Sequence, residues 1–169
     1  MLFSKGYLKK FLDFHAFFID VYQPVVAVFN FSSLYPGDFI EEFNSKRTAL
    51  ALRYRERLQE VDEIILLSDP TYPMRHAWHL FIVRLDTDKA SLDRDEFMYE
   101  LKQKNIGTGL HFRAVHLQKY YRETMGMHRG MLPNTEWNSD RMCSLPLFPE
   151  MTFDDVNDVV DTIKEILSR

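Results

Sequence analysis

The chain has 169 residues, of which 46% are hydrophobic and 27% charged, a composition typical of one globular domain and unlike disordered or collagen-like sequences. Its 21 basic and 25 acidic residues give a net charge of -4, so we predict no nucleic-acid partner, because such binders usually carry a basic excess. The single cysteine, Cys143, excludes an internal disulfide and a zinc site built from cysteines, and we expect a reducing, cytoplasmic location.

The first 40 residues differ in composition from the rest of the chain. They hold 11 of the 24 aromatic residues but only six of the charged ones. The uncharged stretch 21–37 contains Pro24 and several polar residues, which makes it a poor membrane-spanning helix, and we predict no membrane partner. No clean cleavage site follows the early lysines, as a signal peptide would require. We therefore expect an aromatic-rich leader over residues 1–40 and a domain over residues 41–169.

The first regular patterns of the domain predict a helix and a strand. Apolar residues recur every three, four or seven positions, as expected for a helix with one buried stripe: Phe43, Leu50, Tyr54, Leu58 and Val61. The arginines on its other side favour a solvated face, with a phosphate-binding face as the alternative. After a proline-containing turn at 68–73, residues 77–85 (AWHLFIVRL) predict a strand that is apolar on both faces and therefore central.

Two further helices are marked by their capping residues. Asp93 and Glu96 have the spacing of a capping box, so a helix is expected to begin there and to end at Asn105 in a left-handed conformation. Thr152 and Asp155 have the same spacing and open the final helix, which is the most regular amphipathic element of the chain.

The segments between these helices are shorter. Residues 107–112 (GTGLHF) predict a second strand, 118–123 a short helix and 125–134 a mobile loop. Residues 142–148 predict an extended segment at an edge or end of the sheet, because Pro146 cannot donate a ladder hydrogen bond. Together the elements predict an α+β domain in which helices cover a mainly antiparallel sheet.

The densest group of reactive side chains follows the predicted second strand and comprises His111, Arg113, His116, Gln118, Lys119, Tyr120 and Tyr121. His111 and Arg113 are two positions apart, so on a strand both lie on one face. A histidine and an arginine beside flexible glycines suit an anionic or sugar-phosphate ligand. The alternative is a strand end whose polar side chains are solvated, and spacing alone does not decide between the two.

Other chemistries receive less support from the sequence. A metal-dependent hydrolase is the weakest hypothesis, because His76 and His79 lie three apart on a strand and face opposite sides, and no HExxH helix is present. We predict no metal site. Cys143 lies in an apolar extended segment, which is typical of a buried cysteine and not of a catalytic thiolate. No phosphate-binding loop or dinucleotide fingerprint occurs.

Three long segments resemble one protein family. They are HAWHLFIVRLD (76–86), SLDRDEFMYELKQKNIGTGLHFRAVHLQKYYRE (91–123) and LPNTEWNSDRMCSLPLFPEMTFDDVNDVV (132–160). In this order they resemble the C-terminal part of the DegT-like sugar aminotransferases, enzymes that use pyridoxal phosphate (PLP) to aminate keto-sugars on nucleotide carriers. The resemblance begins near Glu41 and implies the small domain of a type I aminotransferase.

The resemblance implies a UDP-sugar substrate, glutamate and 2-oxoglutarate as the amino-donor pair, and a role in lipopolysaccharide or polysaccharide biosynthesis. It implies that His111, Arg113, His116 and Tyr120 contact the substrate. Family members are more than twice as long, and the lysine that forms the Schiff base belongs to their large domain; no lysine here lies in that context. We therefore expect a truncated chain that binds no PLP and is inactive without a large domain or homodimer partner. The alternative is a non-catalytic sugar-nucleotide-binding or assembly module.

Overall fold

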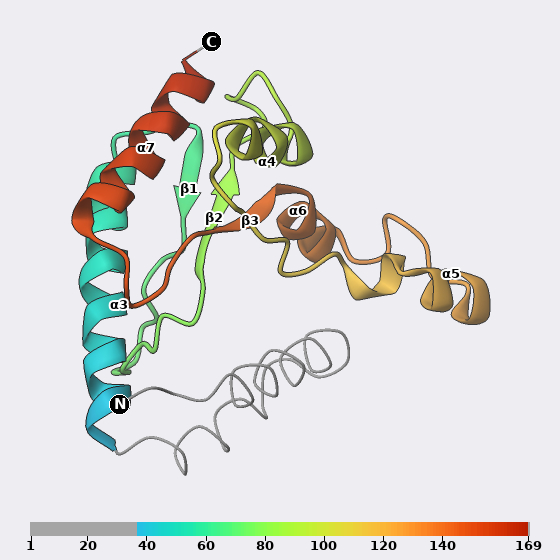
Figure 1. Ribbon diagram of the computed structural model, residues 1–169. Coiled ribbons are helices and arrows are strands. Elements are labelled where there is room, and N and C mark those ends of the chain that lie inside the picture. Colours follow the sequence, from blue (N-terminus) through green and yellow to red (C-terminus); the bar gives the residue numbers. More distant parts are fainter. Residues whose placement is uncertain (1–36, 169) are drawn as a thin grey trace, which may run out of the picture. The chain divides into compact units, whose positions relative to one another are not determined.

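The computed structural model describes residues 37–168 (Figure 1). The predicted leader lies outside the described residues except for 37–40. The described elements are, in order, α3 (Gly37–Leu58), β1 (Ile64–Leu66), β2 (Phe81–Leu85), α4 (Arg94–Gln103), the 3₁₀ helix η1 (Val115–Leu117), α5 (Lys119–Met125), α6 (Pro133–Arg141), β3 (Met142–Leu145) and α7 (Phe153–Leu167). Within residues 37–168, none of the helices combines the length and apolar character needed to traverse a bilayer.

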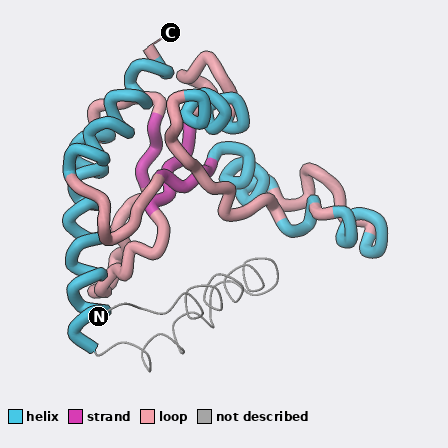
Figure 2. The backbone as a smooth tube through the Cα atoms, in the orientation of Figure 1, coloured by secondary structure: helices cyan, strands magenta, loops and turns pink. Residues whose placement is uncertain are grey.

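The strands form an antiparallel sheet in the order β1-β2-β3 (Figure 2). The prediction that β2 is central is confirmed, since it pairs with both neighbours, and Phe81 lies opposite Leu145 of β3. The strand begins at Phe81 and not at residue 77. The reason is that Trp78 has a left-handed φ of 46°, outside the extended region that a strand requires, and its ring stacks on that of His76.

Helices α3, α4 and α7 bury one face of this sheet. On β2 the alternate side chains Phe81, Val83 and Leu85 are buried. The helices contribute to the same core Leu50, Ala51, Tyr54, Leu58, Phe97, Leu101, Val156, Val159, Val160, Ile163, Ile166 and Leu167. Burial of one large apolar side chain stabilises the fold by about 1.5–3 kcal/mol relative to its exposure. In the predicted stripe of α3, Leu50, Tyr54 and Leu58 are buried as expected, and the amphipathic character predicted for α7 is confirmed by its buried aliphatic side.

The arginines of α3 make hydrogen bonds and ion pairs with other residues of this chain, chiefly on α7. Arg53 and Arg57 both donate to Asn157 Oδ1 of α7, at 2.9–3.1 Å, and Arg57 also pairs with Asp161. These contacts tie the outer edges of α3 and α7 together and support the solvated-face interpretation. Ion pairs at such exposed positions contribute about 0–1 kcal/mol each.

Both predicted capping boxes are present. The Asp93 carboxylate accepts the backbone N–H groups of residues 95 and 96, and Glu96 accepts the N–H of Asp93 in return. Thr152 and Asp155 make the same exchange at the start of α7. Asn105, with φ of 63°, is left-handed as expected.

The segment between α4 and β3 differs most from expectation. The predicted strand 107–112 is wrong: only Gly109 pairs with the sheet, through a two-way backbone exchange with Ser144 at 2.8 and 3.1 Å, before the chain turns away toward η1. The predicted loop 125–134 is cut short because α6 begins at Pro133. Residues 113–141 therefore form an arm that carries η1, α5 and α6 and extends from the sheet beyond β3 (Figure 1). Strand β1 was not predicted.

Candidate functional site

His111 lies where the chain leaves the sheet, and its imidazole is fixed by Ser144. Its Nδ1 is 2.9 Å from Ser144 Oγ, which itself donates to Gly109 O at 3.3 Å. Ser144 thus engages Nδ1 and leaves Nε2 for another hydrogen bond, as donor or acceptor according to the tautomer of the ring. Burial, and then the charge of His79, lower the pKa of His111, which favours this neutral ring. A Cβ at residue 109 would collide with the imidazole and with Ser144 Oγ, so a larger residue there would displace His111 from this position.

A polar cleft of about 420 Å³ lies beside the base of the arm. Its lining is rich in cations and comprises Arg94, Asp95, Arg113, Ala114, Leu117, Gln118, Lys119, Arg122, Arg129, Ser139 and Asp140. Arg94 is paired with Asp95 at 2.6 Å, and Arg129 with Asp140 at 2.6 Å. The other three cations have no acidic partner within residues 37–168, which leaves the cleft with a local positive charge that suits an anion.

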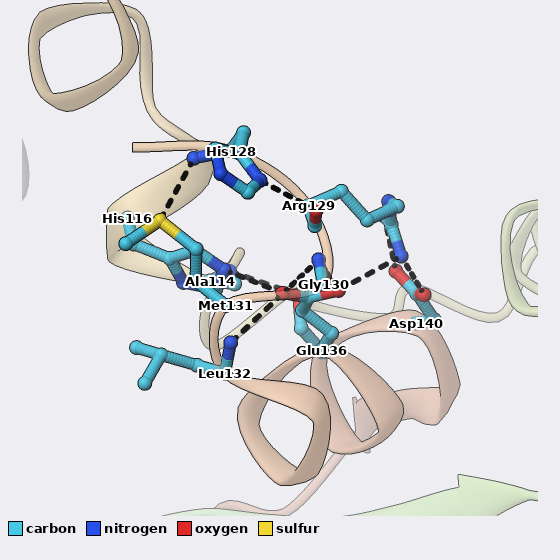
Figure 3. A network of polar contacts seen from close by, with 10 residues as sticks. Ala114, His116, His128, Arg129, Gly130, Met131, Leu132, Glu136 and Asp140 are labelled. Atoms are coloured by element: carbon cyan, nitrogen blue, oxygen red, sulfur yellow. Dashed lines mark hydrogen bonds and ion pairs between the residues drawn. The ribbon is translucent and has the colours of Figure 1, made fainter. Parts of the chain in front are cut away.

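His116, which was predicted alongside Arg113, is buried. It is 4% exposed, and its Nε2 lies 2.8 Å from Glu136 Oε1, as Figure 3 shows. The Glu136 carboxylate also accepts the backbone N–H groups of Gly130 and Leu132, at 2.9 and 3.2 Å. The bond from Gly130 is the main reason that the pKa of Glu136 is lowered, with His116 as a further cause. Glu136 was missed from the sequence because helix α6, which carries it, was not predicted and its partner His116 is 20 residues away.

Ser139 and Arg94 join the arm to α4. Ser139 Oγ accepts the backbone N–H of Ala114 at 2.8 Å, and both residues are buried. The guanidinium of Arg94 donates to the carbonyl oxygens of Ser139 and Met142, at 2.8 and 3.1 Å. These bonds hold residue 114, next to Arg113, at a fixed distance from the start of α4. Neither Ser139 nor Arg94 was predicted as a site residue.

The predicted site residues therefore separate into three environments. Arg113 is exposed at the cleft, His111 is held at the sheet edge, and His116 is enclosed behind the cleft. Tyr120 is 64% exposed on α5, with its ring edge-on to that of Tyr121 at 5.5 Å. Lys119, which belongs to the predicted reactive group, and Arg122, which was not predicted, join Arg113 as cleft cations; the signal for Arg122 in the sequence was its spacing of three from Lys119 on a short helix.

Two alternative chemistries find no support in the described geometry. Cys143 is 1% exposed, and burial raises the pKa of its thiol to about 12, which suits a small core residue and not a nucleophile. Within residues 37–168, no three histidine, cysteine or carboxylate side chains converge as metal ligands. His76 instead accepts the backbone N–H of Trp78 at 2.8 Å.

A profile described as the DegT/DnrJ/EryC1/StrS aminotransferase family matches residues 38–164, most of the chain. The chain belongs to this family. The resemblance read from residues 76–160 is thereby confirmed. The match includes the sheet, the arm and all the cleft residues, so the geometry described above is that of a sugar-aminotransferase segment.

Individual relatives agree with this assignment. The chain is 51% identical, over 134 residues, to the UDP-4-amino-4-deoxy-L-arabinose--oxoglutarate aminotransferase of Shewanella sediminis, with 77% of this chain and 34% of that protein covered. Among solved structures it resembles S. venezuelae DesV in complex with a ketimine intermediate (30% identity, TM-score 0.64) and DesI with its TDP-sugar product (25% identity, TM-score 0.68). Each match covers 76% of this chain and 33% or 32% of the other. The chain thus spans about a third of the length of these relatives.

The family is PLP-dependent, but the described residues do not fit the cofactor. PLP is held by a lysine in an enclosed site, beside a phosphate cup and an acid that faces the pyridine nitrogen. The lysines within residues 37–168 lie at the surface or on the rim of the open cleft: Lys46, Lys89, Lys102, Lys104, Lys119 and Lys164. Several of them are already in ion pairs, for example Lys104 with Glu165 at 2.8 Å.

Proposed function

We propose that residues 41–169 are the small, C-terminal domain of a PLP-dependent aminotransferase that transfers an amino group from glutamate to the 4-keto sugar of a UDP-sugar. Identity of 51% to an amino-arabinose–oxoglutarate aminotransferase supports this substrate class. The similarity to DesI, solved with its TDP-sugar product, supports a nucleotide-linked sugar. The product of such a reaction would serve lipopolysaccharide or polysaccharide biosynthesis.

The observation that carries the proposal is the set of unpaired cations in the cleft. Arg113, Lys119 and Arg122 line it without acidic partners in the described part of the chain. The diphosphate of a UDP-sugar is the anionic part of such a ligand. Guanidinium groups bind phosphate through two parallel N–H bonds, and an ammonium group adds a point charge. We assign the diphosphate to these three side chains.

The remaining predicted residues do not line the cleft, and we propose that His111 and Tyr120 contact parts of the sugar nucleotide beyond its diphosphate. His111 offers Nε2 because its Nδ1 is engaged by Ser144, and a sugar or ribose hydroxyl suits either tautomer, since a hydroxyl both donates and accepts. The exposed Tyr120 presents an aromatic ring and a hydroxyl on α5. His116 has a supporting role, because it is enclosed and its Nε2 is occupied by Glu136.

Titration calorimetry with UDP tests the assignment. Replacement of Arg113 or Arg122 by alanine should weaken binding at least about tenfold, because each change removes charge-assisted hydrogen bonds to the diphosphate. Lys119→Ala should weaken it in the same direction, and Lys102→Ala is the matched control, because Lys102 is an exposed lysine on α4 away from the cleft. Binding should also weaken as salt is added. If the variant with all three cations replaced binds UDP as tightly as the wild type, the diphosphate does not bind to these side chains.

The isolated chain is proposed to be inactive, because no enclosed lysine is found within residues 37–168. Mixed with PLP, glutamate and a UDP-4-keto sugar, it should give neither the absorbance of a lysine-linked PLP nor 2-oxoglutarate. Turnover by the chain alone contradicts this proposal without affecting the assignment of the cleft.

A non-catalytic sugar-nucleotide-binding or assembly module is the second candidate, favoured by the same cations. The two candidates differ when the chain is mixed with a separately produced large domain of the Shewanella relative. Restored transamination supports the aminotransferase domain. UDP binding without restored turnover supports the module.

A further inference from the structure

The Glu136 carboxylate collects hydrogen bonds from two separate parts of the arm. It accepts from His116 Nε2 in η1, and from the backbone N–H groups of Gly130 and Leu132 in the loop that precedes α6, here the 128–132 loop. His116 and Glu136 are 4% and 6% exposed. Because the imidazole and the carboxylate are largely shielded from water, these two buried groups depend on this network for their hydrogen bonds.

The same carboxylate completes the start of α6. Leu132 is the N-cap and has no side chain that can accept a hydrogen bond, but its own N–H is accepted by Glu136, which resembles the reciprocal half of a capping box. A negative charge in the first turn is also favoured by the helix dipole. Gly130 has φ of 95°, a conformation open to glycine and strained for other residues, and it directs its N–H at both carboxylate oxygens.

The loop held in this way carries one wall of the cleft. Arg129 directly precedes Gly130, and its guanidinium makes a bidentate pair with Asp140 of α6, at 2.6 and 3.1 Å (Figure 3). Arg129 and Asp140 both line the cleft. Release of Gly130 from Glu136 would free the backbone that sets the direction of the Arg129 side chain.

We propose that His116 and Glu136 are positioning residues, which fix the 128–132 loop and thereby place Arg129 and Asp140 as one wall of the cleft. That Arg129 and Asp140 shape the cleft for a UDP-sugar rests on the proposed function, whereas the fixing of the 128–132 loop by His116 and Glu136 does not. His116 Nδ1 is buried and has no partner within residues 37–168, so the ring is held through Nε2 alone. His116 therefore donates its Nε2–H to a carboxylate that only accepts.

The experiment uses the full chain labelled with ¹⁵N and compares His116→Ala, His116→Gln and Glu136→Gln with the wild type. Glu136→Gln and His116→Ala should speed amide exchange at Gly130 and Leu132 by at least about tenfold. They should also change the side-chain Nε signal of Arg129. His116→Gln should restore part of the protection, because its amide group can still donate to Glu136. Glu123→Gln is the matched control, since it removes the same charge from an exposed position of the arm.

The outcomes separate the inference from the proposed function. The UDP affinity of each variant is measured as well. If amide exchange at Gly130 is unchanged in both Glu136→Gln and His116→Ala, the inference is overturned, whatever the UDP affinity of these variants. Faster exchange with unchanged UDP affinity supports the fixing of the loop and refutes the placement of the wall. If the wild type binds no UDP, the proposed function is refuted. Amide exchange at Gly130 and Leu132 still tests whether His116 and Glu136 fix the loop. If Glu136→Gln does not fold, equal exchange in His116→Ala and His116→Gln overturns the inference.

Discussion

The sheet with its three covering helices and the arm are stabilised by different kinds of contact. Every buried residue of α7 is aliphatic, and α3 and α4 bury chiefly apolar side chains against β2. In the arm, η1 buries only His116, α6 buries Glu136 and Ser139, and α5 buries no residue. Apolar packing is strong and non-directional, whereas buried polar groups stabilise only if each finds its partner. The arm therefore gains a defined geometry for its cations at the cost of depending on a few hydrogen bonds.

The largest expected effect comes from the apolar region. Phe97 of α4 is fully buried, and Phe97→Ala should lower the free energy of unfolding by about 3–5 kcal/mol, because the lost transfer free energy is joined by the cost of a cavity. Chemical denaturation measures this directly. Tyr99→Ala on the exposed side of the same helix should change stability by less than about 0.5 kcal/mol. A decrease below about 1 kcal/mol for Phe97→Ala would show that the two regions are not stabilised differently.

A smaller and more local effect is expected in the arm. Ser139→Ala removes the acceptor of the buried Ala114 N–H and should cost about 1–3 kcal/mol. The change should appear as faster amide exchange at Ala114 and weaker UDP binding at the neighbouring Arg113, with core amides still protected. Ser91→Ala, at an exposed serine, is the control. If Ser139→Ala instead lowers protection from amide exchange equally in the core and the arm, the two regions unfold together and are not stabilised separately.

The same contrast explains how far the sequence predicted the fold. Helices with apolar stripes were found because one side of each is buried, as Leu58 and Ile163 show. Capping boxes were found because both partners lie three residues apart. Helix α6 was missed because its buried residues are polar and give no apolar period. Strand β1 was missed because three residues carry too little pattern.

The candidate site was predictable only in its exposed part. Arg113 was identified from residue type and local spacing, which is sufficient for a cation at a surface. The partners that organise it are remote in sequence: Glu136 is 20 residues from His116, and Ser139 is 25 from Ala114. The periodicity of one sequence does not reveal such hydrogen-bonded pairs, because they form only when the arm folds back on itself.

Acidification should produce the smallest change, chiefly in the arm; outside the arm it should reach the first turn of α7, because the bonds from Thr152 also lower the pKa of Asp155. The pKa of Glu136 is lowered chiefly by its bond from Gly130, and that of Asp140 chiefly by its bond from Arg129. Groups with a lowered folded-state pKa contribute their full stability above the unfolded pKa, near about 4 for carboxyls, and lose it as pH falls through the folded value. Amide exchange at Gly130, corrected for its intrinsic pH dependence, should therefore be constant from about pH 7 to about pH 5 and accelerate below about pH 4. Core amides such as that of Val160 should stay protected over the same range, because no ionised group within the apolar cluster supports them. Equal loss of protection at Gly130 and Val160 would mean that the acid-sensitive bonds of the arm also support the core.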